Sequence, residues 1–138
     1  MEVDTMTTRD VVEQFFGMVG GGANPDDIAM LFSDDLDWDV PGSPSIPWTG
    51  RRSKRADVAD YLRTLGANIV PEENVDEIEA ILYDGDNAVM LGRFGRVARN
   101  TGRRYEMAVA MHFQVSGDKI IKFRLYEDSF QVANAYAE

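Results

Sequence analysis

The residues best suited to hold a small molecule gather around two tryptophans. Trp38 lies in a short alternating strand expected at 36–40, and Trp48 follows ten residues later in a segment rich in proline and glycine. Large aromatic side chains beside the mouth of a strand are typical of a hydrophobic ligand pocket. The same two residues would equally serve as a core side chain and an apolar lid over that core. Both interpretations stay open from the sequence.

Three side chains could exchange a proton or form a hydrogen bond with a ligand in such a pocket: Asp39, Tyr61 and Tyr105. Strict alternation directs Asp39 to the face opposite Trp38, and a bulge at Pro41 would be needed to turn it inward. Tyr61 and Tyr105 offer hydroxyl groups, although buried tyrosines commonly satisfy a backbone acceptor instead.

Metal and nucleic-acid chemistry are poorly supported, and no cofactor is expected. The chain has one histidine, His112, and no cysteine, while the acidic run 34–37 lacks the glycine and glutamate of a calcium loop. A net charge of −10 argues against nucleic acid as a partner. The basic cluster 51–55 is interpreted as a solvated loop and helix start, with a rim that attracts anions as the alternative.

Composition predicts one globular domain over residues 1–138, with residues 1–8 flexible. The chain has 138 residues, of which 44% are hydrophobic, and this is enough for a real core. Its apolar runs are too short to span a bilayer, and residues 1–10 carry no apolar signal segment. Because cysteine is absent as well, a cytoplasmic protein with no membrane association is expected.

Hydrophobic periodicity predicts an α+β fold. Helical spacing marks 7–20, 24–32 and 54–65, and alternation marks strands at 36–40, 75–83, 88–98, 105–115 and 120–126, before a terminal helix at 128–136. Three N-terminal helices would then pack on a strongly curved, mostly antiparallel sheet. Such an arrangement encloses a conical cavity.

This order of elements resembles the nuclear transport factor two-like superfamily. The residues that carry the resemblance are LFSDD at 31–35, VPG at 40–42, WTG at 48–50 and GDKIIKFR at 117–124. The superfamily includes SnoaL-like polyketide cyclases, ketosteroid isomerases and limonene epoxide hydrolases. The resemblance spans 10–136, and its motifs specify a fold rather than a reaction.

The resemblance implies that the catalytic groups of these relatives are mostly replaced. The tyrosine, the basic aspartate and the protonated aspartate of ketosteroid isomerases fall on Phe15, Val40 and Met111. A ketosteroid isomerase mechanism would therefore lack its base and both donors. Epoxide hydrolases would match at Arg93, but their two acids fall on Gly95 and Leu125. The histidine and glutamate of many SnoaL-like relatives would fall on Met111 and Leu125 too.

If Met111 and Leu125 line the cavity, as the resemblance implies, alternation assigns the rest of the inner face. The implied pocket residues are Phe15, Trp38, Val40, Trp48, Tyr61, Tyr105, Val109, Met111, Phe123 and Leu125. Arg93 and Glu127 would be the only charged residues facing inward, either as a structural ion pair or as catalytic groups. Arg93, Glu127 and Asp39 are the catalytic candidates.

Two functions are compatible with this pattern. The first is binding of a hydrophobic small molecule, with isomerisation, cyclisation or hydration by Arg93 and by Glu127 or Asp39. The alternative is a protein that binds an apolar ligand without chemistry, or a structural dimer. A homodimer is expected in either case, formed through an outer sheet face that carries Phe94, Ala108, Ala110, His112 and Arg124.

Overall fold

The computed structural model describes residues 6–138, so the flexibility expected for residues 1–5 lies outside the described residues. The elements in chain order are α1 (Thr8–Gly20), α2 (Pro25–Ala29), β1 (Phe32–Val40), β2 (Gly50–Lys54), α3 (Arg55–Asn68), a 3-10 turn (Pro71–Glu73), β3 (Val75–Asp84), β4 (Asn87–Val97), β5 (Arg104–Ser116), β6 (Lys119–Tyr126) and α4 (Ser129–Tyr136). No described helix is long and apolar enough to cross a membrane.

Local sequence explains where the helices begin. Thr7 and Asp10 form a reciprocal capping box at the start of α1. The Asn24 side chain accepts from the Asp26 backbone N–H ahead of α2, and Asp128 does the same for Gln131 ahead of α4. These side chains satisfy backbone donors that a helix leaves unpaired.

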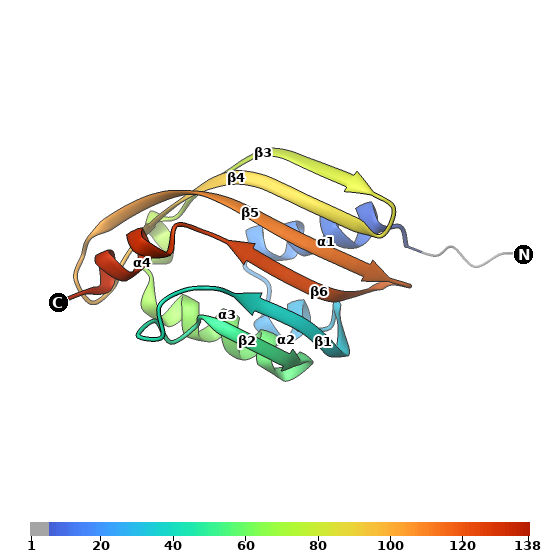
Figure 1. Ribbon diagram of the computed structural model, residues 1–138, viewed down its shortest axis with the longest axis horizontal. Helices are drawn as coiled ribbons and strands as arrows, with labels where there is room; N and C mark the ends of the chain where they lie inside the picture. Colours follow the sequence, from blue (N-terminus) through green and yellow to red (C-terminus); the bar gives the residue numbers. More distant parts are fainter. Residues whose placement is uncertain (1–5) are drawn as a thin grey trace, which may run out of the picture.

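The six strands form one curved mixed sheet in the order β2-β1-β6-β5-β4-β3 (Figure 1). Strands β1 and β6 run parallel, and the other neighbours are antiparallel. Helix α1 packs on β4 and β5, while α3 packs on β1 and β2. The α+β prediction is confirmed, and the interior between helices and sheet is where a pocket can form.

The sequence suggested that the basic cluster 51–55 is a solvated loop and helix start. In the structure residues 51–54 belong to the edge strand β2, and Arg55 begins α3. The cations of this cluster pair with acids of β1 and α3: Arg51 with Asp37 and Asp39, Arg52 with Asp60, Lys54 with Asp35, and Arg55 with Asp34. Strand β1 begins at Phe32, earlier than the strand expected at 36–40, and its pairing with β2 is irregular between Asp35 and Trp38. Charged side chains on an edge strand discourage pairing with another chain.

The C-terminal helix α4 is fastened by the turn between β4 and β5. The side chains of Asn100, Thr101 and Arg103 donate hydrogen bonds to four consecutive backbone carbonyl groups, those of residues 134–137. These carbonyls have no partner within the helix. The turn therefore fixes the position of α4 at the end of the sheet where β6 ends (Figure 1).

Candidate functional site

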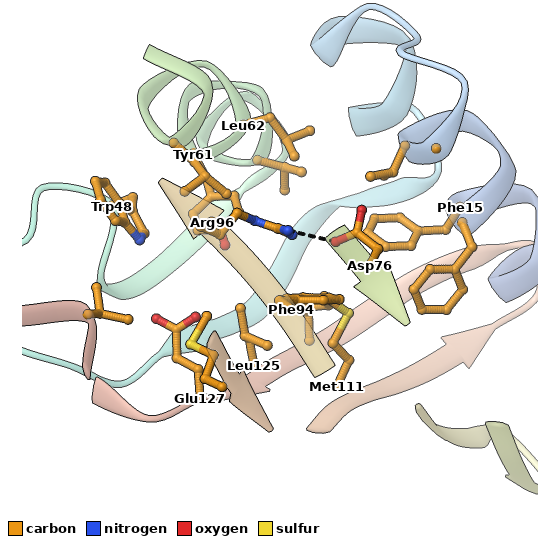
Figure 2. A pocket seen from close by; sticks show the side chains of 18 of the residues that line it. Phe15, Trp48, Tyr61, Leu62, Asp76, Phe94, Arg96, Met111, Leu125 and Glu127 are labelled. Atoms are coloured by element: carbon orange, nitrogen blue, oxygen red, sulfur yellow. Dashed lines mark ion pairs between the residues drawn. The ribbon is translucent and has the colours of Figure 1, made fainter. Parts of the chain in front are cut away.

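A cavity of about 190 Å³ lies between α1, α3 and the inner face of the sheet. Most of its walls are apolar or aromatic, and two charged side chains, Arg96 and Glu127, reach its interior (Figure 2). Its exposed rim is formed by Val19, Asp76 and Ile78. The mouth therefore lies between the end of α1 and the start of β3.

Nine residues assigned inward from the sequence line this cavity: Phe15, Trp38, Trp48, Tyr61, Tyr105, Met111, Phe123, Leu125 and Glu127. Val40 and Val109 are buried but lie outside the lining. Trp38 is both core and wall, because it is 1% exposed and stacks on Phe123 with ring centres 4.2 Å apart. The two interpretations of Trp38 are therefore compatible.

The proline-rich segment 41–47 does not line the cavity, whereas Trp48, which the sequence offered as a pocket wall or as a lid over the core, is a buried wall residue. The Thr49 hydroxyl group contacts the carbonyls of Ser43 and Ile46, and Ile46 is buried. Ile46 thus anchors a segment whose other residues are mostly exposed.

The inward assignment of Arg93 is wrong by one residue. Strand β4 pairs Phe94 with Met107 and Arg96 with Tyr105. Residues directly opposite each other in an antiparallel pair project to the same face, so Phe94 and Arg96 point inward. Arg93 is exposed on the outer face, and the outward assignment of Phe94 is wrong for the same reason.

Asp39 also points away from the cavity. Its carboxyl group lies 3.8 Å from the Arg51 guanidinium on the outer side of β1. The irregularity in β1 falls between Asp35 and Trp38, before Asp39, and no turn at Pro41 brings the side chain inward. Alternation alone therefore gives the correct face.

Arg96, which the sequence pattern did not single out, crosses the cavity. Its Nη1 atom lies 2.7 Å from Asp76 Oδ1 and donates to the Gly95 carbonyl at 2.9 Å. The guanidinium carbon lies 4.5 Å from the centre of the Phe94 ring, a cation–π arrangement. Figure 2 shows the side chain reaching past Phe94 toward Asp76. Burial leaves 11% of it exposed.

Glu127 follows β6 and lines the inner part of the cavity. Among the described residues its carboxyl group has no hydrogen bond and no ion pair, so the ion pair with Arg93, one of the two alternatives left open by the sequence, is absent. Burial raises the pKa of Glu127 to about 7, and the nearby Arg96 charge only partly opposes this rise. Figure 2 places the carboxyl group on the Trp48 side of the pocket.

Two tyrosines of the wall differ in what they offer a ligand. Tyr136 donates to the Asn68 carbonyl at 2.9 Å, so the 3.1 Å contact between hydroxyl groups requires Tyr105 to donate to Tyr136. Tyr105 therefore presents oxygen lone pairs to the cavity. Tyr61 has no hydrogen-bond partner among the described residues, and its proton remains available. Burial raises the pKa of both Tyr61 and Tyr105, which keeps them protonated.

The described residues contain no group of three or more potential ligands that could hold a metal ion. His112 bonds Asn87 through Nε2 at 2.9 Å on the outer sheet face, away from the cavity. The arrangement can bind an apolar body, accept a hydrogen bond at Tyr105, donate hydrogen bonds from Tyr61 and Arg96, and exchange a proton at Glu127.

Solved structures share this fold at low sequence identity. An NTF2-like (nuclear transport factor two-like) protein from Burkholderia thailandensis is 21% identical, with 96% of this chain and 99% of that chain covered and a TM-score of 0.84. TerC, co-crystallised with polyporic acid, is 11% identical over 93% and 96%, with a TM-score of 0.79. A protein of ketosteroid isomerase-like fold from Catenulispora acidiphila, in complex with trimethylamine, is 16% identical over 94% and 93%, with a TM-score of 0.74.

Sequence comparison gives the family. No curated protein matches the chain significantly. The family model described as SnoaL-like domain matches residues 12–123, which is most of the chain. The chain therefore belongs to the SnoaL-like domain family.

Proposed function

We propose that the protein binds a small, largely apolar molecule in this cavity, and that Glu127 exchanges a proton with it during isomerisation, cyclisation or hydration. The observation that carries the proposal is a largely desolvated carboxyl group, without a partner among the described residues, in a pocket walled by aromatic and aliphatic side chains. Structural carboxyl groups are normally paired when buried, whereas catalytic ones are often held at perturbed pKa values.

The size of the cavity limits the ligand. An engineered cavity of about 150 Å³ in another protein holds benzene. The 190 Å³ observed here suits a molecule with one ring or a short branched chain, with larger groups extending through the mouth. The TerC and Catenulispora structures hold small molecules, and this is consistent with ligand binding in the present chain.

The chemistry follows from the groups that surround Glu127. A carboxyl group with a pKa near 7 can both accept and donate a proton at neutral pH. The Tyr61 hydroxyl and the Arg96 guanidinium can stabilise negative charge that develops on the ligand. Asp39 and Arg93 have no part in the proposal, because both point to the outer face.

The binding part of the proposal predicts that toluene, a neutral single-ring probe, binds the pocket. It should quench tryptophan fluorescence, because Trp38 and Trp48 border the cavity, and raise the melting temperature by mass action. The Glu127→Gln variant should bind toluene as well as the wild type does. Absence of binding in both proteins would contradict the proposal.

The proton-transfer part is tested by hydrogen–deuterium exchange. Phenylacetone carries an acidic C–H beside its carbonyl group, and exchange of that proton in D₂O can be followed by NMR. The wild type should accelerate exchange, and Glu127→Gln should lose about a hundredfold or more of that acceleration. Equal rates for both proteins, with toluene binding intact, would favour the second candidate function, binding without chemistry.

We also propose a homodimer through the outer sheet face. Pairing across the sheet sets Leu91 opposite Ala110 and Ala110 opposite Tyr126, which forms an apolar row whose end members are 40% and 53% exposed. Ala110→Arg should give monomers in light scattering at about 50 µM, where even weak dimers persist. Ala67→Arg, at an exposed position of α3, is the control and should leave the dimer intact. A monomeric wild type would refute this proposal.

A further inference from the structure

Arg96 uses only one of its three guanidinium nitrogens in the described contacts. Nη1 serves both Asp76 and the Gly95 carbonyl, while Nε and Nη2 have no partner among the described residues. Guanidinium carries five N–H donors, so three of them remain without a protein acceptor. Unsatisfied donors at a largely buried group are costly unless something else completes their hydrogen bonds.

The free edge of Arg96 belongs to the cavity. The side chain is 11% exposed and lines the pocket, and the Phe94 ring covers one face of its plane. Nε and Nη2 are not among the fully enclosed atoms without partners, which are Trp38 Nε1, Arg52 Nε and Asn74 Oδ1. The two nitrogens therefore keep accessible surface on a side chain that lines the cavity.

Two adjacent N–H groups on one edge of a guanidinium match the two oxygens of a carboxylate. We propose that the ligand carries a carboxylate that binds the Nε and Nη2 edge of Arg96, with its ring or short chain among the apolar walls. This inference rests on the proposed function and names its ligand class. Asp76 can stay in place, because it contacts only Nη1 and is half exposed at the mouth.

Among the described residues, the inner part of the cavity holds one cation, Arg96, whose acidic partner Asp76 lies at the exposed mouth. An ammonium group would find an acceptor at Glu127, but it would share the cavity with the incompletely paired Arg96 guanidinium. Glu127 is mostly protonated at about pH 6, because burial raises its pKa to about 7, and then does not repel a carboxylate. Tyr61, Tyr105 and Tyr136, which surround it, are neutral there.

The experiment compares four single-ring probes by calorimetry at about pH 6: benzoate, benzamide, toluene and benzylamine. Benzoate should bind wild-type protein at least about tenfold more tightly than the isosteric benzamide. Arg96→Met should remove this preference, whereas toluene should still bind. Arg96→Lys keeps the charge but not the planar edge, so it should lose most of the preference. Arg93→Met, a β4 arginine on the outer face, is the matched control and should change nothing.

Each outcome separates the two proposals. Equal affinity for benzoate and benzamide, or a preference for benzylamine, would overturn the carboxylate inference while toluene binding kept the proposed function. Failure of all four probes to bind would overturn the proposed function itself. If Arg96→Met does not fold, the ratio of benzoate to benzamide affinity in Arg96→Lys decides the inference, and an unchanged ratio refutes it.

Discussion

Glu127→Gln is expected to stabilise the protein above neutral pH by about 3 kcal/mol. Burial raises the pKa of this carboxyl group from 4.5 to about 7, so ionisation is unfavourable in the folded state. Each pKa unit corresponds to about 1.4 kcal/mol, which gives the stated order of magnitude. Glutamine keeps the size of the side chain and removes the charge.

The direction of the Glu127 pKa shift determines the pH range in which wild type and variant differ in stability. Below the ordinary pKa of 4.5 the carboxyl group is neutral in both folded and unfolded chains, and Glu127 costs nothing. As pH rises toward about 7, the unfolded chain releases its proton first, so the stability of the wild type falls relative to that of the variant. Above that range the difference is constant. Arg96 is the charged group that opposes the shift.

Urea unfolding of wild type and variant across this range measures the difference directly. The control is Glu79→Gln on the exposed strand β3, which should change stability by less than about 0.5 kcal/mol at every pH. A Glu127→Gln variant that is less stable than the wild type above neutral pH would show that the carboxylate has a partner in solution.

Met111→Trp is expected to abolish toluene binding while the protein remains folded. Met111 lines the cavity opposite Leu125, and the indole ring of the variant would occupy the space that a ligand uses. Toluene should then no longer raise the melting temperature. Some loss of stability, about 1–3 kcal/mol, is expected from crowding. Leu91→Trp on the outer face of β4 is the control and should keep full binding.

Two results would contradict the pocket assignment. If Met111→Trp unfolds the protein, the space is packed core without room for a ligand. If toluene binding survives the substitution unchanged, the probe binds elsewhere on the molecule. Circular dichroism of the variant without ligand distinguishes the first result from simple loss of binding.

The sequence predicts most elements because their signals are local. The capping residues Thr7 and Asp128 and the alternation of β3 to β6 depend on near neighbours in the chain. Strand β2 has no such signal, since Arg51 and Lys54 form an edge strand through contacts with acids of β1. The sequence alone therefore predicts that the basic cluster 51–55 is solvated, because its pairing with β1 is not visible in the local pattern.

The inner face of a strand could be predicted where alternation started from a residue whose orientation was already known, as in β5 and β6. Tyr105 and Met111 on β5 were assigned to the inner face and line the cavity. Arg93 was assigned to the inner face by family resemblance, but it points outward, and its neighbour Phe94 points inward. Counting back from the turn that pairs Ala98 with Arg103 would have set Arg96 opposite Tyr105. No sequence pattern indicated Asp76, because its ion pair with Arg96 depends on how β3 lies beside the mouth of the cavity.

The fastening of α4 by the β4–β5 turn has a consequence for biosynthesis. During translation the strands and the first three helices emerge before residues 127–136, which supply Glu127 and Val132 to the cavity and the Tyr136 hydroxyl group to Tyr105. Until then Tyr105 lacks its hydroxyl partner, and the wall formed by Glu127 and Val132 is missing from the cavity. A ligand therefore finds the complete lining, and exerts its full stabilising effect, only once α4 has docked on Asn100, Thr101 and Arg103.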